Sequence, residues 1–191
     1  MSIKVSNYWL FACLSGIVGL LFLVNGLTLS VKALLAQTLI HNAWQQVQHE
    51  QKPQLAKPWP WADTYPVAQL MFADKSLYVL NGATGEALSF GPGHYTQTVL
   101  PGTKGDSVIA GHRDSHFAVL KTLKMGDIIT AKNYLGESQR YKVEELKIID
   151  SRKEKIQFDN QQNRLQLITC YPFDKITAGG PLRYVVMARF L

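Results

Sequence analysis

The stretch Arg164-Leu165-Gln166-Leu167-Ile168-Thr169-Cys170 is a short run rich in Leu, Ile and Thr, and a Pro follows it at position 172. Thirteen positions after Cys170, Arg183 opens a second run, Arg183-Tyr184-Val185-Val186. Short runs of apolar and β-branched residues that end at turn residues are typical of strands. We therefore predict that residues 164–170 and 183–190 form the last strand pair of a β-sheet domain, with Cys170 at the end of its strand.

Similar short runs precede this pair, separated by Gly, Pro, Asn and Asp residues. We predict further strands over residues 67–72, 77–80, 107–111, 127–131 and 140–150, and a short helical turn over residues 116–123. Seven or eight strands without alternating long helices favour an antiparallel barrel or sandwich. The fold class is thus all-β for a domain that we place at residues 59–191.

The amino-terminal part has a different character. No charged residue lies between Lys4 and Lys32, and the run from Tyr8 to Val31 is dominated by apolar residues. A helix needs roughly 20 apolar residues to cross a bilayer. We predict a tail and a single transmembrane helix over residues 1–31. The alternative is a cleaved signal peptide, but such peptides have apolar regions of about 7–15 residues, and no clean cleavage site follows here.

Residues 32–58 join these two parts. Their first half keeps helical spacing, and Pro53 and Pro58 then interrupt any helix, so we predict a helical stalk followed by a Pro-rich linker. The positively charged residues on the two sides of the predicted span do not decide its orientation. A short tail before a large domain favours a domain on the extracytoplasmic side of the membrane.

Charge and cysteine content exclude several classes of function. The net charge of +6 is shared evenly, because residues 1–60 and residues 61–191 each carry +3. Scattered and mildly basic charge does not indicate a nucleic-acid partner. Cys13 lies in the predicted span and Cys170 is the other cysteine, so the sequence predicts neither a disulfide framework nor a thiolate metal cluster.

Three side chains form a candidate set for acyl transfer. Cys170 is the candidate nucleophile, because a thiolate attacks carbonyl carbon strongly. His112, in the segment Gly111-His112-Arg113-Asp114, is the candidate proton carrier, with His94 and His116 as competitors. Arg183 would place a fixed positive charge beside an oxyanion. Each residue alone has a simpler interpretation as packing, a loop histidine or a solvated charge.

The local context of these residues resembles one family. Leu167-Ile168-Thr169-Cys170 is similar to the sortase active-site signature, although Gln166 stands where that signature commonly has Thr. Pro101-Gly102 and the segment 108–113 resemble the histidine segment of sortases, and Gly91 to Tyr95 resembles the stretch before it. Arg183 resembles the family's arginine. Trp59-Pro60-Trp61-Ala62-Asp63, together with an amino-terminal anchor, most resembles the membrane-anchored proteobacterial branch.

The resemblance implies an eight-stranded sortase-type β-barrel and a two-step cysteine transpeptidation. Cys170 would cleave a Leu-Pro-x-Thr-Gly-like sorting signal between Thr and Gly, and a thioacyl enzyme would pass the acyl group to an amine. His112 would carry the proton, Arg183 would hold substrate and oxyanion, and Thr169 would assist in substrate binding. The implied partners are a protein with a carboxy-terminal sorting signal and an acceptor amine, at the periplasmic side of the inner membrane.

The resemblance implies no cofactor, and we expect no metal site. The acidic residues Glu137, Glu144, Glu145 and Asp159 are too dispersed in the sequence for calcium, which needs six to eight converging oxygens. Two other functions stay open. One is a membrane-tethered cysteine peptidase that only hydrolyses, and the other is a non-catalytic β-barrel binding module in which Cys170 is packing.

Overall fold

The computed structural model begins with one long helix. It describes residues 4–49, 55–159, 162–175, 177 and 179–191. Helix α1 spans Lys4–His49. Contacts divide the chain into two compact units, one that ends at Thr38 and one that runs from Leu39 to Leu191. The three predicted boundaries, residues 1–31, 32–58 and 59–191, stay predictions.

The membrane span expected over residues 8–31 falls within α1. In the part of the chain that the structure describes, no helix combines the length and the apolar character needed to cross a bilayer. The side chains of residues 25 and 27–30 lie outside the described residues. The expected span therefore stays a prediction from the sequence.

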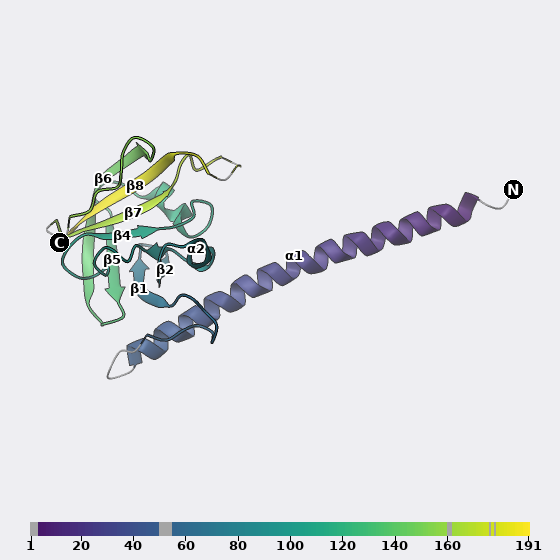
Figure 1. Ribbon diagram of the computed structural model, residues 1–191, viewed down its shortest axis with the longest axis horizontal. Helices are drawn as coiled ribbons and strands as arrows, with labels where there is room; N and C mark the ends of the chain where they lie inside the picture. The colour runs from purple at the N-terminus through teal and green to yellow at the C-terminus, as the bar shows by residue number, and fades with distance from the viewer. Residues whose placement is uncertain (1–3, 50–54, 160–161, 176, 178) are drawn as a thin grey trace. The chain divides into compact units, whose positions relative to one another are not determined.

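The second unit is a closed barrel. Within the described residues, eight strands form it: β1 (Pro66–Met71), β2 (Ser76–Asn81), β3 (Gly93–His94), β4 (Ser107–Ala110), β5 (Ile128–Asn133), β6 (Ser138–Asp150), β7 (Arg164–Cys170) and β8 (Leu182–Phe190). Their order around the barrel is β1-β2-β3-β4-β7-β8-β6-β5 (Figure 1). The predicted eight-stranded barrel is confirmed.

Strand direction differs from the prediction at two places. The expectation of a purely antiparallel sheet is wrong for β2–β3 and for β4–β7, which are parallel pairs. Strands β5 and β6, which lie between β4 and β7 in the sequence, do not lie between them in the barrel, where β4 is the direct neighbour of β7. This pairing places the carboxy-terminal ends of β4 and β7 side by side, which determines the position of the site.

The barrel interior is filled by apolar side chains. Leu165 and Leu167 of β7 are fully buried and pack with Ile109, Tyr141 and Phe117. Phe117 belongs to the 3-10 helix η1 (His116–Thr122), where a helical turn was predicted. Burying a large apolar side chain stabilises a fold by about 1.5–3 kcal/mol. The inward-facing residues of β7 therefore anchor the strand that carries Cys170.

The outer face of the same strands carries a second, smaller apolar cluster. Val108, Ile149, Ile168 and Val185 form it, and Ile156 packs against them. Ile156 lies in the β6–β7 segment, which we define as the described residues between these strands, 151–159 and 162–163. This segment therefore crosses the outer face of the barrel and covers part of it.

Two helical pieces also pack against the barrel. Helix α2 (Gly85–Phe90) begins at Thr84, whose hydroxyl accepts a hydrogen bond from the backbone N–H of Ala87. Ile40, near the carboxy-terminal end of α1, packs with Leu80 and Ala87. These contacts lie within the unit that starts at Leu39.

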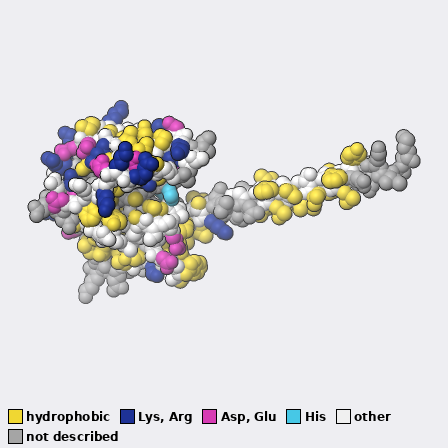
Figure 2. All heavy atoms as spheres, turned by 45° about the horizontal axis from the view of Figure 1, so that its top comes forward, with side chains coloured by type: hydrophobic (Ala, Val, Ile, Leu, Met, Phe, Trp, Pro, Cys, Tyr) yellow, Lys and Arg dark blue, Asp and Glu magenta, His cyan; other side chains and the backbone are white. Residues whose placement is uncertain are grey.

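The surface of the barrel carries mixed charge. On the face turned to the viewer in Figure 2, Lys and Arg side chains lie among Asp and Glu side chains and apolar ones. Ion pairs on the surface include Arg189 with Glu144 at 3.1 Å and Lys121 with Asp174 at 2.8 Å. Exposed pairs of this kind contribute little to stability.

Candidate active site

Cys170 and Arg183 are paired across two neighbouring strands. Cys170 ends β7, Arg183 is the second residue of β8, and the antiparallel register places them directly opposite each other. Directly opposed residues project to the same face, with Cβ atoms about 4.5–5.5 Å apart. Both residues are half-buried. The sulfur and the guanidinium therefore extend from adjacent positions at one end of the β7–β8 pair.

His112 is brought to the same end by the parallel pair β4–β7. The register pairs Ala110 with Ile168, and the backbone N–H of Gly111 donates to the carbonyl of Ile168 at 3.0 Å. The Thr169 hydroxyl then donates to the carbonyl of Gly111 at 2.7 Å. His112 follows Gly111 and Cys170 follows Thr169, so the histidine leaves β4 beside the end of β7.

The Thr169 side chain is buried and forms a hydrogen bond with the backbone. Thr169 is 1% exposed and its hydroxyl is committed to Gly111. Its expected part in substrate binding stays a prediction. What the geometry shows is a link between the residue before the cysteine and the residue before the histidine.

Gly111 must be a glycine in this arrangement. A Cβ atom added there would lie 2.7 Å from the ring of Phe117, which is far inside van der Waals contact. Phe117 is fully buried in the barrel core. The backbone before His112 therefore lies directly against the core, and this close approach fixes where the histidine segment starts.

The two competing histidines differ in position, because His94 lies on another strand and His116 lies near enough to His112 to be affected by its charge. His94 is in β3, which pairs with β2 and β4, and its Nε2–H donates to the carbonyl of Val99 at 2.9 Å. Burial lowers the pKa of His94, and its hydrogen bonds to Val99 and Thr98 oppose that shift in part. His116 begins η1, and burial lowers its pKa, with a further decrease from the charges of Lys75 and His112.

A cavity of about 430 Å³ lies on the outer face of the barrel beside this cluster. Its walls come from β4, β7, β8, the β6–β7 segment and the loops near α2 and β3: Ala83, Tyr95, Val108, Ala110, Ser151, Glu154, Lys155, Ile156, Phe158, Ile168 and Arg183. Most of this lining is apolar, and the rings of Tyr95 and Phe158 meet edge to face at 5.9 Å. The cavity reaches Arg183, so Cys170 stands at its edge.

The β6–β7 segment that covers this cavity is fastened to the barrel by Asp106. The Asp106 carboxylate is fully buried and accepts hydrogen bonds from the backbone N–H groups of Asp159 and Arg164. It also accepts from the Nε and Nη2 groups of Arg164, at 3.1 and 2.7 Å. The bond to Asp106 raises the pKa of the Arg164 guanidinium above its ordinary value. A paired buried carboxylate of this kind holds the segment in one position.

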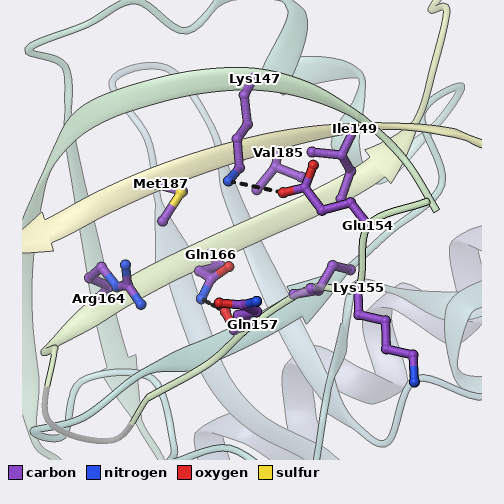
Figure 3. Close-up of a pocket in the computed structure, with 10 residues that line it drawn as sticks. Lys147, Ile149, Glu154, Lys155, Gln157, Arg164, Gln166, Val185 and Met187 are labelled. Atoms are coloured by element: carbon purple, nitrogen blue, oxygen red, sulfur yellow. Dashed lines mark hydrogen bonds and ion pairs between the residues drawn. The ribbon is translucent and has the colours of Figure 1, made fainter.

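A second hollow, of about 190 Å³, lies farther along β7. Glu154, Lys155 and Ile156 line both hollows, so the β6–β7 segment separates them. Figure 3 shows that Lys147 and Glu154 meet across this hollow, at 3.8 Å, and that the Gln166 side chain reaches the segment. The Gln166 amide donates to the carbonyl of Gln157 at 2.9 Å. Gln166, the departure from the family signature, therefore supports the segment that covers the cavity.

Two residues that the structure places around the site were not predicted as site residues from the sequence. Asp106 is one, and Arg113 is the other, because it donates hydrogen bonds to the segment that follows Cys170. The adjacency of Arg113 to His112 was visible, but no local pattern connects either residue to its partners. Among the described residues, no group of three or more His, Cys, Asp or Glu side chains converges as metal ligands would.

The arrangement can support nucleophilic chemistry on a carbonyl. Cys170 and Arg183 are paired at the edge of a largely apolar cavity on the outer face of the barrel, and the segment that carries the exposed His112 begins beside the end of β7. An extended peptide could place apolar side chains in the cavity and a carbonyl beside Cys170. The roles of Cys170, His112 and Arg183 stay predictions.

Comparisons with known proteins agree with this geometry. The model of the Sortase domain family matches residues 72–191. Sortase D of Bacillus subtilis (strain 168) is 31% identical over 114 residues, which cover 59% of this chain and 57% of that protein. The chain thus spans just over half the length of this curated relative.

Solved structures share the same fold. The Clostridium perfringens Sortase D5 transpeptidase superposes with a TM-score of 0.63 at 18% identity, covering 82% of this chain and 98% of that one. A lid mutant of Sortase A from Corynebacterium diphtheriae gives 0.59 at 22% identity, with 81% and 93% covered. At these identities the likeness concerns the fold alone. Because the Sortase domain model matches more than half of the residues of this chain, the chain belongs to the sortase family.

Proposed function

We propose that this chain is a sortase-type cysteine transpeptidase that exchanges a peptide bond in a sorting signal. The observation that carries the proposal is the direct pairing of Cys170 with Arg183 at the edge of the apolar cavity. Family membership supports the same reaction class, and the Clostridium perfringens relative is named a transpeptidase. The substrate is a Leu-Pro-x-Thr-Gly-like signal at the carboxy terminus of a protein.

The first step forms a thioester. The Cys170 thiolate attacks the carbonyl carbon of the Thr residue, and the negative charge that develops on oxygen is stabilised by the Arg183 guanidinium. When the C–N bond breaks, the imidazolium of His112 gives its proton to the departing Gly amine. The acyl group is then held on the sulfur, and no electrons are gained or lost.

The second step reverses the same chemistry with a different amine. The acceptor amine attacks the thioester carbonyl, His112 takes the proton from the attacking nitrogen, and the Cys170 thiolate departs. One peptide bond is broken and one is formed, so the reaction needs no cofactor. A water molecule in place of the amine would give hydrolysis.

The apolar cavity suits the residues before the scissile bond. Ile156, Val108 and Ile168 offer apolar walls, and Tyr95 and Phe158 close one side of the cavity. Side chains such as Leu and Pro gain free energy by leaving water for such walls. This supports a signal in which apolar residues precede the cleaved Thr-Gly bond.

Membrane anchoring is proposed from the sequence alone. The uncharged run between Lys4 and Lys32 supports a single span. A catalytic domain on the extracytoplasmic side of the inner membrane is part of the same proposal. Tethering enzyme and substrate to one bilayer would raise their effective concentration. The resemblance of residues 59–63 to the proteobacterial branch belongs to the same proposal. Membrane fractionation tests the span, and a protein found in the soluble fraction contradicts it. Protease treatment of spheroplasts tests the orientation, and a domain that is cleaved only after the cells are lysed contradicts it.

The decisive test of activity uses the full chain with a panel of Leu-Pro-x-Thr-Gly peptides and triglycine. Mass spectrometry should find a thioacyl adduct on Cys170 and a product ligated to triglycine. Cys170→Ala should abolish both, whereas Cys13→Ala, which removes the other thiol, should abolish neither. Cleavage without ligation would identify a peptidase that only hydrolyses. No adduct with any peptide, together with a Cys170 that resists alkylation, would identify a binding module.

A further inference from the structure

We propose that Arg113 is a positioning residue for the transpeptidation, a role that rests on the proposed function. Its buried guanidinium holds the described part of the β7–β8 segment, residues 171–175, 177 and 179–181, in an arrangement that orients Arg183 and the start of the His112 segment beside Cys170. The function assigned above uses the histidine before Arg113 and leaves this side chain unexplained.

The contacts of Arg113 reach from the histidine segment to the segment after the cysteine. Its Nη2 group donates to the backbone carbonyls of Lys175 and Thr177, the latter at 2.9 Å. Its Nε group donates to the carboxylate of Asp114 at 3.1 Å. The carbonyls belong to residues 62 and 64 positions away, so the contact joins two distant parts of the chain.

All three candidate catalytic residues are next to a part of this contact. His112 immediately precedes Arg113, and Cys170 and Arg183 flank the β7–β8 segment. Arg183 also depends on that segment, because its Nη1 group donates to the carbonyls of Gly180 and Leu182 at 2.6 and 2.9 Å. Holding the segment therefore orients the guanidinium of Arg183 as well as the strand ends.

The buried charge of Arg113 is incompletely paired, which costs free energy and supports a positioning role over a stabilising one. The residue is 3% exposed, and its acidic partner Asp114 has a side chain that is 67% exposed. Its Nη1 atom is buried and has no hydrogen-bond partner among the described residues. A buried charge that is incompletely paired is a poor stabilising device. Its geometric value is different, because a guanidinium fork directs several donors at once in fixed directions.

Loss of this fork should therefore affect the chemical step more than peptide binding. The apolar walls of the cavity come mainly from β4, β7 and the β6–β7 segment, none of which contacts the Arg113 side chain through a described hydrogen bond. Small displacements of catalytic groups cost much more in kcat, with about 1 Å of misplacement costing 10²-fold. Lys at position 113 keeps the charge but loses the planar fork whose Nε and Nη2 groups reach Asp114 and the two carbonyls in fixed directions.

The experiment compares Arg113→Lys and Arg113→Ala with the wild-type full chain. We expect kcat for peptide transfer to triglycine to fall by about 10²-fold in both variants while KM for the peptide stays near wild type. Methylguanidine should restore part of kcat to Arg113→Ala, because it can occupy the vacated site. The matched control is Arg189→Lys, an exposed arginine on β8 that pairs with Glu144, and it should keep wild-type kcat.

A second measurement does not require a substrate. The rate of Cys170 alkylation by iodoacetamide, followed against pH, reports the environment of the thiol directly, and Arg113→Lys should change this profile while Arg189→Lys should not. A wild-type kcat in Arg113→Lys overturns the proposal. The proposal is also overturned if both variants have a lower kcat, a higher KM and a lower thermal stability, and methylguanidine restores none of these in Arg113→Ala. That result indicates a purely structural role. If the wild-type chain transfers no peptide, the proposed function fails, and an alkylation profile unchanged in Arg113→Lys then overturns the positioning role separately.

Discussion

Cys170 and Arg183 are direct cross-strand partners in the antiparallel pair β7–β8, although eleven residues separate the two strands in the sequence. A cross-strand pair is among the firmest ways to hold two side chains side by side, because backbone hydrogen bonds on both strands fix the register. The nucleophile and the positive charge are therefore positioned by the barrel wall itself. The cross-strand pairing sets how far apart the two residues lie, and the segment between them orients the Arg183 guanidinium through the carbonyl of Gly180.

Replacing Arg183 should lower the rate of acyl transfer without unfolding the protein. Arg183→Ala removes the positive charge beside the oxyanion, and loss of one such group lowers kcat by about 10²–10³-fold. Arg183→Lys should lie between wild type and Ala, because the charge stays but the planar fork is lost. Its described side-chain hydrogen bonds go to the nearby carbonyls of Gly180 and Leu182, so thermal stability should change little.

Steady-state transfer of a peptide to triglycine measures this effect. Arg189→Ala is the matched control, because it removes an arginine from the other end of the same strand. A variant lacking Arg183 that transfers peptide as fast as wild type would show that the guanidinium is a solvated charge.

Replacing Thr169 should show whether its hydroxyl supports the backbone at Gly111 or binds the peptide substrate. Thr169→Val leaves the carbonyl of Gly111 buried without its donor, which costs about 1–3 kcal/mol of unfolding free energy. Because Gly111 precedes His112, kcat should fall with it. Thr169→Ser keeps the hydroxyl and should retain most of both quantities.

Urea unfolding and peptide-transfer kinetics on the two variants check this expectation. Full stability and activity in Thr169→Val would mean that the hydrogen bond to Gly111 does not support the site. A rise in KM with unchanged stability would instead return Thr169 to the substrate-binding role expected from the sequence.

The strands that carry the active residues could be predicted because each has its own local signal. Cys170 ends a run of apolar and β-branched residues, and Arg183 opens another, so their places at strand ends were predicted and observed. Strand β3 was missed because Gly93–His94 has only two residues, too few for any periodicity. The parallel pairing of β4 with β7 was also missed, since a local pattern contains no information about which strand will lie beside it.

The supporting contacts of the site were beyond prediction for a similar reason. Asp106 and Arg164 lie 58 positions apart, and each is an ordinary charged residue at the beginning of an apolar run. Arg113 finds its carbonyl partners more than 60 positions away. Such contacts are created by barrel closure, and only the closed barrel reveals that these charges are buried.

Removing the Asp106 carboxylate should loosen the cover of the cavity. Asp106→Ala breaks a buried ion pair, which costs about 3–5 kcal/mol of unfolding free energy. In the folded fraction, KM for the peptide should rise more than kcat falls, because Ile156 and Phe158 of the released segment line the cavity. Asp106→Asn should give a smaller change in the same direction, since its amide oxygen still accepts hydrogen bonds.

Glu144→Gln provides the control for this prediction. It breaks the exposed pair with Arg189, which should change stability by about 0–1 kcal/mol. Denaturant unfolding and the ratio of KM to kcat distinguish the two variants. Equal effects of Asp106→Ala and Glu144→Gln would contradict the idea that Asp106 fastens the β6–β7 segment.

Stability should depend on pH through His94. Burial lowers the pKa of this residue below its ordinary value of 6.5, so the folded protein holds His94 neutral at a pH where the unfolded chain already binds a proton. Between the two pKa values the unfolded state carries more protons, and stability therefore rises with pH. The contribution is fully present above about pH 6.5 and is lost as the pH falls from there through the folded pKa.

Urea unfolding of the wild type and of His94→Gln between pH 5 and pH 8 measures this contribution. Gln can still donate a hydrogen bond to the carbonyl of Val99 but does not titrate, so the variant should lose less stability on acidification than the wild type. His116, whose pKa burial also lowers, is present in both proteins, and its effect cancels in the difference. The difference in unfolding free energy between the two proteins should therefore change with pH only below about 6.5, where the unfolded histidine is protonated. Parallel curves over the whole range would mean that His94 accepts a proton in the folded barrel as easily as in the unfolded chain, which its buried position between β2 and β4 argues against.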